Sequence, residues 1–511
     1  MLVHQKQLKE TSCPQLSVLL LMFLSTLVMC ETDNYLKQRD AILKREQEEF
    51  IGGNMVLTQK EEKVNGYLLE LKKNELVESY KNFSAFLPAK NFLIAKEDIE
   101  LSKVFQFIKK VPKAASLHTH MLAGVNADYI IENFSYMENV YGCYNEMQVF
   151  KLRVLKDAKQ DGNCSWKSLK TYRKELQQNN TNFDDFLKSK LTLDETFINQ
   201  SRENVWAKFK NLFSTIYDLV SYKPLFQKFV YQLLKELYDD NVFYTELRGT
   251  FMPLYDLNGT TYDAKVFFET LMATVEDFKK DHPNFLGVKY IHSIYRGVDN
   301  STLKNALEEL IYFKSLYPDF IAGFDFVGLE EDGRNLLDFH EELSGVAKDL
   351  KFFFHAGETN QFGKTDLNLL DAILLNCSRV GHGFALAKHP ELMVMARNRD
   401  IAVELCPISN QVLKLNQDPR NHPAAVLLSK NYPIVICNDD PSAWGATGVS
   451  YDWYVVFMSM TWENHGLAVL KSFALNSIRY SGMSEREKIN ALTVWERQWD
   501  QFIDDILENL S

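Results

Sequence analysis

The sequence has few cysteines and no excess of positive charge. Seven cysteines among 511 residues are too few for a disulfide scaffold. Asp and Glu number 68 against 57 Lys and Arg, a net charge of −11, which argues against broad nucleic-acid binding because that needs a basic face. Hydrophobic residues make up 46%. A chain of this size and composition can bury a core without disulfides or metal, so any metal site should serve chemistry.

Several catalytic motifs are also missing. The chain has no Walker A loop, no His-Glu-x-x-His and no Gly-x-Ser-x-Gly, which are the motifs of P-loop proteins, zinc proteases and serine hydrolases. Nucleic-acid deaminases combine His-x-Glu with Pro-Cys-x-x-Cys. The segment His340-Glu341-Glu342 matches the first half by chance, but the chain contains no Cys-x-x-Cys.

Residues 1–30 have the pattern of a secretory signal peptide. Lys6 and Lys9 precede an apolar run from Leu16 to Val28, and a cleavage site falls before Glu31. The run covers about thirteen residues, whereas a membrane-spanning helix needs roughly 20. We therefore expect a secreted, extracellular protein that does not span a membrane.

Sequons and cysteines agree with secretion. Nine Asn-x-Ser/Thr sequons together with a signal peptide are typical of a secreted glycoprotein. After cleavage five cysteines remain, and we expect a disulfide between Cys143 and Cys164, which lie close together in a polar stretch. Cys406 and Cys437 lie in apolar runs, which favours buried free thiols. The candidate glycosylation sites are Asn82, Asn133, Asn163, Asn179, Asn199, Asn258, Asn300 and Asn376, with a ninth sequon at Asn509.

Three zones follow the signal. Residues 31–110 are charged with helical periodicity, so we expect helices that either mediate dimerisation or cover the main domain. That domain spans 111–511 and is interrupted at 126–186 by a polar surface insertion. Its apolar runs alternate with helical stretches, which predicts parallel βαβ units, and eight of them favour an α/β fold of the (β/α)8 TIM type. No Gly-x-Gly-x-x-Gly opens a helix, which disfavours a doubly wound sheet. The runs are Ala114–His120, Val242–Leu247, Val288–His292, Phe320–Val327, Phe352–His355, Ser378–Gly381, Ile401–Cys406 and Ile434–Asn438.

Polar residues follow the carboxyl ends of these runs, where a barrel has its active site. His118 and His120 are two apart on one strand and so face the same side. His355 ends the fifth run, and Asp439 follows the eighth. Three imidazoles and one aspartate suit a single catalytic zinc ion, which lowers the pKa of a bound water toward about 7.

Three further polar groups lie at the same ends, namely Glu358, His382 and Asp440. One of them can handle the proton of the water, and another can protonate the leaving side. The residues alone do not decide which group takes which role.

Four segments resemble the signatures of the adenosine deaminase family, in the same order and spacing. They are His118-Thr119-His120, His355-Ala356-Gly357-Glu358, Gly381-His382-Gly383 and Asp439-Asp440-Pro441. The signal peptide and residues 204–209, 322–325 and 404–414 resemble the secreted branch of that family, the adenosine deaminase-related growth factors. The resemblance covers nearly all of the mature chain and is weakest in the insertion.

The resemblance implies a role for each matching residue. His118, His120, His355 and Asp439 would be the zinc ligands. Glu358 resembles the acid that protonates the purine ring nitrogen beside the attacked carbon. His382 resembles the residue that orients and deprotonates the zinc-bound water. The substrate-binding residues would be Asp440, which holds a purine nitrogen, Gly328, whose backbone contacts the ring, and Trp206, which lines the pocket. The branch also carries an amino-terminal dimerisation region and a disulfide-closed insertion.

One residue departs from the pattern of the secreted branch. Members usually have aspartate directly after the second histidine of the first signature, where this chain has Met121. In relatives an aspartate near that strand end is associated with the ribose or the metal shell. Its absence bears on ribose recognition, unless another carboxylate, such as Asp128 or Glu246, substitutes for it.

The resemblance predicts a secreted, zinc-dependent, homodimeric deaminase. It would convert adenosine and 2′-deoxyadenosine to inosine-type products plus ammonia and so lower extracellular adenosine. Two alternatives stay open. The chain could be a secreted growth factor or receptor ligand on a deaminase scaffold, with a cell-surface receptor or glycan as partner. It could also deaminate a different purine, a change that Met121 motivates.

Overall fold

The computed structural model describes residues 34–82, 85–158, 160–161 and 164–510. The expected signal peptide at 1–30 and the sequon at Asn163 lie outside the described residues. Among the described helices, none is both long and apolar enough to cross a membrane.

Eight parallel strands form two four-stranded sheets, and their order follows the sequence prediction. The first sheet has the order β1-β7-β8-β9 and the second the order β10-β11-β12-β13. Single parallel bridges join the sheets on both sides, between Thr119 and Asp439 and between Phe324 and Phe352. The strands are β1 (Ala114–His120), β7 (Val242–Gly249), β8 (Gly287–Tyr295), β9 (Ile321–Val327), β10 (His355–Ala356), β11 (Arg379–His382), β12 (Ala402–Leu405) and β13 (Ile434–Ile436).

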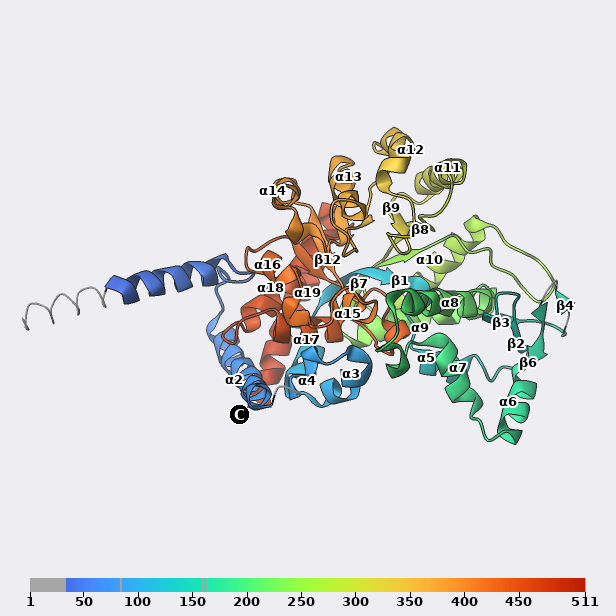
Figure 1. The fold of residues 1–511 in the computed structure, drawn as a ribbon, viewed down its shortest axis with the longest axis horizontal. Coiled ribbons are helices and arrows are strands. Elements are labelled where there is room, and N and C mark those ends of the chain that lie inside the picture. Colours follow the sequence, from blue (N-terminus) through green and yellow to red (C-terminus); the bar gives the residue numbers. More distant parts are fainter. Residues whose placement is uncertain (1–33, 83–84, 159, 162–163, 511) are drawn as a thin grey trace, which may run out of the picture.

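Helices surround these strands (Figure 1). The longer helices among them bury apolar residues along one side. Side-chain caps fix where some of them begin: Asp263 accepts from the N–H of Val266, and Asp299 from that of Thr302. The covering helices are α8 (Arg202–Val220), α9 (Lys223–Asp239), α10 (Ala264–Asp281), α11 (Asn300–Leu316), α12 (His340–Val346), α13 (Asn368–Leu374), α14 (Pro390–Asn398), α15 (Pro407–Val412), α16 (Ala424–Leu428), α17 (Ser450–Ser459), α18 (Leu467–Arg479) and α19 (Glu485–Glu508).

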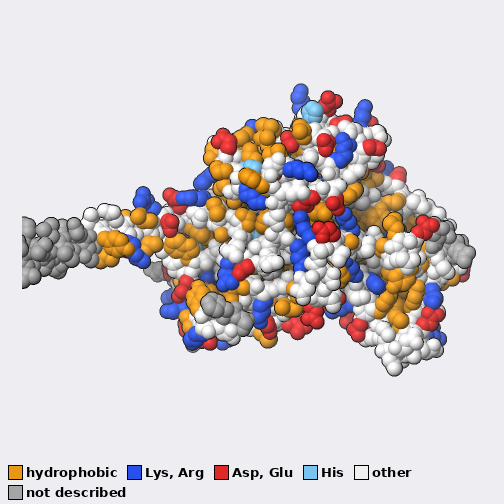
Figure 2. Space-filling model, viewed as in Figure 1, with side chains coloured by type: hydrophobic (Ala, Val, Ile, Leu, Met, Phe, Trp, Pro, Cys, Tyr) orange, Lys and Arg blue, Asp and Glu red, His pale blue; other side chains and the backbone are white. Residues whose placement is uncertain are grey.

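The amino-terminal zone is helical, as predicted. Its helices are a first one over 34–49, then α2 (Gln59–Lys81), α3 (Phe92–Leu101) and α4 (Lys103–Lys110). Helix α2 packs against α18 and α19 at the other end of the chain, and its buried Glu61 accepts a hydrogen bond from Trp499 Nε1 at 2.7 Å. The helix over 34–49 instead projects away from the body, with hydrophobic side chains on its surface (Figures 1 and 2).

The segment at 126–186 is more ordered than a polar surface insertion suggests. It holds α5 (Ala127–Asn133), α6 (Leu169–Gln178), α7 (Phe183–Leu191) and a three-stranded antiparallel sheet of order β3-β2-β6. Phe150, Leu152 and Leu169 are buried in it, so the segment has apolar packing of its own. The expected disulfide between Cys143 and Cys164 is present. The strands are β2 (Val140–Tyr144), β3 (Phe150–Val154), β4 (Gln160–Asp161), β5 (Cys164–Ser165) and β6 (Lys167–Ser168).

The cysteine arrangement gives a test. The thiols of Cys377, Cys406 and Cys437 are free and buried. We expect alkylation of the denatured, unreduced mature protein to label these three, and reduction to add Cys143 and Cys164. Because burial shields the free thiols, the native protein should react with none of them. Labelling of Cys143 and Cys164 without reductant, mapped by peptide mass spectrometry, would contradict the disulfide.

Candidate active site

A cavity of about 600 Å³ opens at the carboxyl ends of the strands. It brings together residues that are hundreds of positions apart in the sequence, because parallel strands of a barrel end on one face. Of the sequence-predicted site residues, His118 alone does not line the cavity, and it is fully buried beside His120. The others that line it are Trp206, Gly328, His120, His355, Glu358, His382, Asp439 and Asp440.

Three imidazoles and a carboxylate converge at the floor of this cavity. The Nε2 atoms of His118 and His120 lie 3.3 Å apart, and they lie 3.1 Å and 3.2 Å from Asp439 Oδ1. One ligand atom from each of His118, His120, His355 and Asp439 falls within 4.8 Å of all the others. The predicted metal ligands are therefore neighbours in space.

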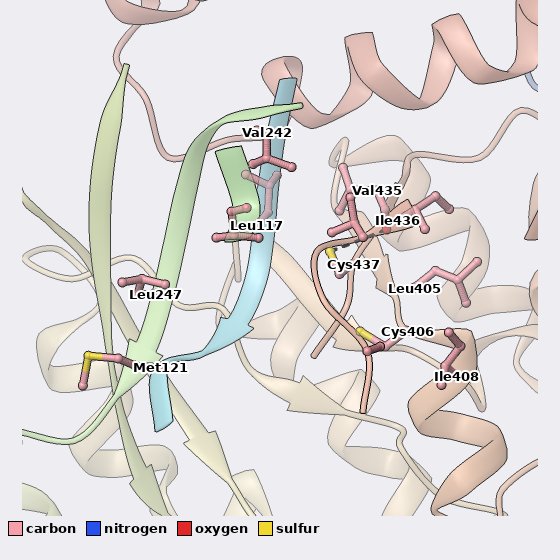
Figure 3. Close-up of a cluster of buried hydrophobic side chains, with 14 of the residues drawn as sticks. Leu117, Met121, Val242, Leu247, Leu405, Cys406, Ile408, Val435, Ile436 and Cys437 are labelled. Atoms are coloured by element: carbon pink, nitrogen blue, oxygen red, sulfur yellow. Dashed lines mark hydrogen bonds between the residues drawn. The ribbon is translucent and has the colours of Figure 1, made fainter. Parts of the chain in front are cut away.

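A second, overlapping group replaces His120 and His355 by His382 and Cys406. Burial raises the pKa of the Cys406 thiol well above its usual value, and the thiol donates to the carbonyl oxygen of Glu404. Cys406 and Cys437 point among apolar side chains (Figure 3). Because a metal binds the thiolate rather than the thiol, the three-histidine set is the better cation site.

Two carboxylates behind the histidines fix which nitrogen carries each proton. Glu404 lies 2.7 Å from Nδ1 of His118, and Asp325 lies 2.7 Å from Nδ1 of His355. A carboxylate accepts, so each Nδ1 donates and each Nε2 turns a lone pair toward the site. Asp439 Oδ1 is likewise buried and accepts no hydrogen bond from the described residues. Lone pairs packed this closely repel one another, and a divalent cation among them satisfies them all.

Arg248 holds the two carboxylates in place. Its Nη1 donates to Asp325 at 2.5 Å, and its Nη2 donates to Glu404. All three side chains are fully buried. The sequence analysis missed Asp325 and Glu404 as site residues, although a charged residue inside an apolar strand run signals a buried partner.

The acid–base groups line the cavity beside the cation site. Burial, with Asp439 and Glu330 nearby, raises the pKa of Glu358 well above its usual value, which favours the neutral carboxyl. Burial and the adjacent Asp439 likewise raise the pKa of Asp440. His382 lies between Glu358 and Asp439. Its Nδ1 is 3.7 Å from Glu358 Oε1, and its Nε2 is 3.8 Å from Asp439 Oδ2. The cavity thus places two carboxyl groups whose neutral form is favoured next to the candidate cation site.

Backbone strain is concentrated here. His382 and Asp439 have φ angles of 58° and 56°, in the left-handed region that costs a residue with a Cβ atom about 1–3 kcal/mol. Gly328 has a φ of +104°, and a Cβ atom there would lie 2.8 Å from the ring of Tyr295. Glycine is therefore needed where the backbone lines the cavity.

Met121 lines the wall of the cavity and is buried (Figure 3). Neither carboxylate considered as its substitute is nearby. Glu246 pairs with Arg379 at 2.5 Å, and Asp128 forms a largely exposed pair with Lys188. Neither lines the cavity, so no carboxylate from these two positions replaces the missing aspartate.

Comparison with known proteins places the chain in a family. Residues 182–494 match the family model described as adenosine deaminase, and residues 17–108 match the adenosine/AMP deaminase amino-terminal model. The chain belongs to the adenosine deaminase family and is a hydrolase of the deaminase class.

Similar curated proteins span the same length. Adenosine deaminase 2 of Sus scrofa is 41% identical over 92% of this chain and 94% of its own. Adenosine deaminase of the sand fly Phlebotomus duboscqi is 38% identical over 93% of this chain and 92% of its own.

Solved structures confirm the fold. The N6-mAMP deaminase of Arabidopsis superposes with a TM-score of 0.55 at 17% identity, covering 77% of this chain and 99% of its own. An amidohydrolase of Burkholderia ambifaria, solved with bound zinc, superposes with a TM-score of 0.53 at 20% identity, covering 79% of this chain and 95% of its own. The TIM-type α/β fold expected from the sequence is therefore correct.

The hydrogen bond from His355 to the carboxylate of Asp325 leads to a prediction about metal affinity. In Asp325→Asn the hydrogen bond to His355 Nδ1 is weakened and the charge facing Arg248 is lost. We expect metal affinity to fall by roughly 10–100-fold, measured by competition with a chelator. The matched control is Asp240→Asn, which alters a buried carboxylate paired with Lys113 at 3.6 Å, away from the site. Equal metal affinity in both variants would contradict the assignment.

Proposed function

We propose that this protein is a secreted, zinc-dependent deaminase that hydrolyses adenosine, and 2′-deoxyadenosine, to the inosine-type product and ammonia. The carrying observation is the convergence of His118, His120, His355 and Asp439 beside Glu358, whose pKa is raised. The names of the relatives at 38–41% identity support adenosine as the substrate.

The ligand set suits zinc, with imidazole and carboxylate donors on one side and the open cavity on the other. Zinc held there would supply the Lewis acidity that activates a water molecule at neutral pH. Glu358 donates its proton to the ring nitrogen next to the attacked carbon, as the ring loses its aromatic resonance. Asp440, whose pKa is also raised, donates to a second purine nitrogen and holds the base. One C–O bond forms and the bond from that carbon to the amino group breaks. Of the two protons of the water, one replaces the proton that Glu358 gave to the ring nitrogen, and the other leaves on the ammonia.

The direct test is conversion of adenosine to inosine by the purified protein, followed by ultraviolet absorbance. We expect turnover that a chelator removes and that added zinc restores. Bound zinc without conversion of adenosine or 2′-deoxyadenosine would contradict the proposed substrate, and turnover unaffected by complete metal removal would contradict the proposed zinc.

Glu358 provides a sharper prediction. Glu358→Gln keeps the shape of the side chain but removes the carboxyl proton, so we expect kcat to fall by at least about 100-fold. Because Glu358 is not among the proposed ligands, zinc content measured by mass spectrometry should stay the same. Turnover close to wild type would refute its role as the acid.

A second candidate substrate class is favoured by the cavity wall. Met121, Phe209, Phe213, Met252 and Val298 make the wall largely apolar away from the cation site. A purine nucleoside with fewer hydroxyl groups or an apolar substituent on its sugar would bury those walls at less cost than ribose. The test is a panel of adenosine, 2′-deoxyadenosine and 5′-substituted analogues. A higher kcat/KM for the nucleosides with the less polar sugar than for adenosine would favour this second class.

Secretion and dimerisation complete the proposal. The sequons at Asn133, Asn179, Asn258 and Asn376 have exposed asparagines, which suits a glycoprotein. At Asn300, by contrast, the side chain is half-buried and its amide donates to Glu342 at 2.8 Å, so we expect little glycan there. We propose that residues 31–110 form the dimerisation region, which the exposed helix over 34–49 supports. Size measurement of the secreted chain by light scattering tests this.

A further inference from the structure

Three buried side chains form a chain of hydrogen bonds that ends on His382. They are His422, Asn410 in α15, and His382 at the end of β11, and at most 2% of each is exposed. His422 Nε2 lies 2.9 Å from Asn410 Oδ1, and Asn410 Nδ2 lies 3.1 Å from His382 Nδ1. Neither Asn410 nor His422 lines the cavity. They therefore touch the site through His382.

A backbone amide sets the direction of this chain. The N–H of Ala424 points at His422 Nδ1 at 3.1 Å. A backbone N–H can only donate, so His422 Nδ1 must accept, and the neutral ring carries its proton on Nε2. That N–H needs an acceptor, which must be the amide oxygen of Asn410. The amide nitrogen of Asn410 then faces His382 and donates to its Nδ1. No step depends on how the amide is assigned, since the opposite orientation would set two donors against each other.

We propose that Asn410 and His422 are positioning residues that hold His382 as the tautomer protonated on Nε2. The Nε2–H is the end that faces Asp439, 3.8 Å from Oδ2. His382 therefore orients the attacking water by donating to it, and it is a poor base at Nε2 as long as Asn410 occupies Nδ1. This proposal rests on the proposed function for its kinetic consequence, but the tautomer itself is a property of the protein alone.

The role implied for His382 by the family resemblance changes accordingly. To take a proton at Nε2, the neutral His382 ring would need a lone pair on Nε2 and therefore its own proton on Nδ1. That Nδ1–H would point at the amide nitrogen of Asn410, which is also a donor. Two buried donors that face each other leave a hydrogen without an acceptor, which disfavours this tautomer. Orientation of the water thus stays with His382, and removal of its proton falls to another group.

Asn410→Asp tests the proposal by reversing the polarity with little change in shape. A carboxylate still accepts from His422 Nε2–H, but it also demands a proton on His382 Nδ1. We expect the ring ¹⁵N signals of His382 to exchange their protonated and unprotonated patterns, in holoenzyme labelled with ¹⁵N-histidine and assigned with His382→Gln. We also expect kcat to fall by about 100-fold or more with KM changed only a few-fold, because Asn410 does not line the cavity.

Gln411→Glu is the matched control. Gln411 is also a buried amide of α15, and it donates to the carbonyl oxygens of Lys90 and Gln417 at 3.1 Å and 2.9 Å, away from His382. It carries the same amide-to-acid change and the same strain on α15. We expect the His382 signals to keep the wild-type pattern in this variant. Zinc content is measured for every variant.

His422 provides an independent variant in case Asn410→Asp does not fold. In His422→Phe the donor that orients the Asn410 amide is lost, and the new ring can still pack against Phe384 as the imidazole does. We expect mixed His382 tautomers and a lower kcat. His422→Gln retains an N–H that can donate to Asn410 Oδ1, and it should restore the Nε2–H pattern and much of kcat.

The spectra alone decide the proposal. A proton on His382 Nδ1 in the wild-type protein would overturn it, as would an unchanged pattern in folded Asn410→Asp or His422→Phe. Absence of adenosine turnover in the wild type would refute the proposed function and leave the tautomer assignment standing.

Discussion

The buried ion network around Arg248 is the constraint on which the rest of the site depends. One guanidinium spans Asp325 on β9 and Glu404 on β12, and each of these carboxylates holds one histidine of the cation site. Burying such charges is expensive, and an apolar replacement of the whole set would often fold as well or better. The network therefore contributes geometry more than stability. It brings two strands from different sheets of the barrel to one fixed spacing.

The strands of the barrel and the polar residues at their ends could be predicted from the sequence, because both depend on local patterns. Alternating apolar runs and helical stretches predicted every strand of the barrel, because parallel strands are buried on both faces and need apolar residues throughout. The polar ends of those runs predicted which side chains gather at one end of the barrel. His118 and His120 in particular share a face through the two-residue period of a strand.

Other features of the fold and the site could not be predicted, because they depend on contacts between residues far apart in the sequence. Glu404 is 286 residues from His118, and no local pattern pairs them. The segment at 126–186 was expected to be polar, yet Phe150 and Leu169 are buried there, because a small antiparallel sheet buries one face even when its average composition is polar. Replacement of Met121 by a distant carboxylate was an open alternative, and only the positions of Glu246 and Asp128 in space exclude it.

The histidines show why a motif cannot specify chemistry by residue type alone. His118 and His355 each face a carboxylate at Nδ1, which leaves a lone pair at Nε2 and suits them to hold a cation. His382 lies only 5.1 Å away from His355, ring centre to ring centre, but it faces an amide N–H at Nδ1 and so directs a proton, not a lone pair, toward the same place. A carboxylate at position 410 would make His382 resemble the ligands, whereas asparagine makes it a donor. The partner behind each ring therefore separates the histidines that are suited to hold a metal from the one that we propose faces the reacting water.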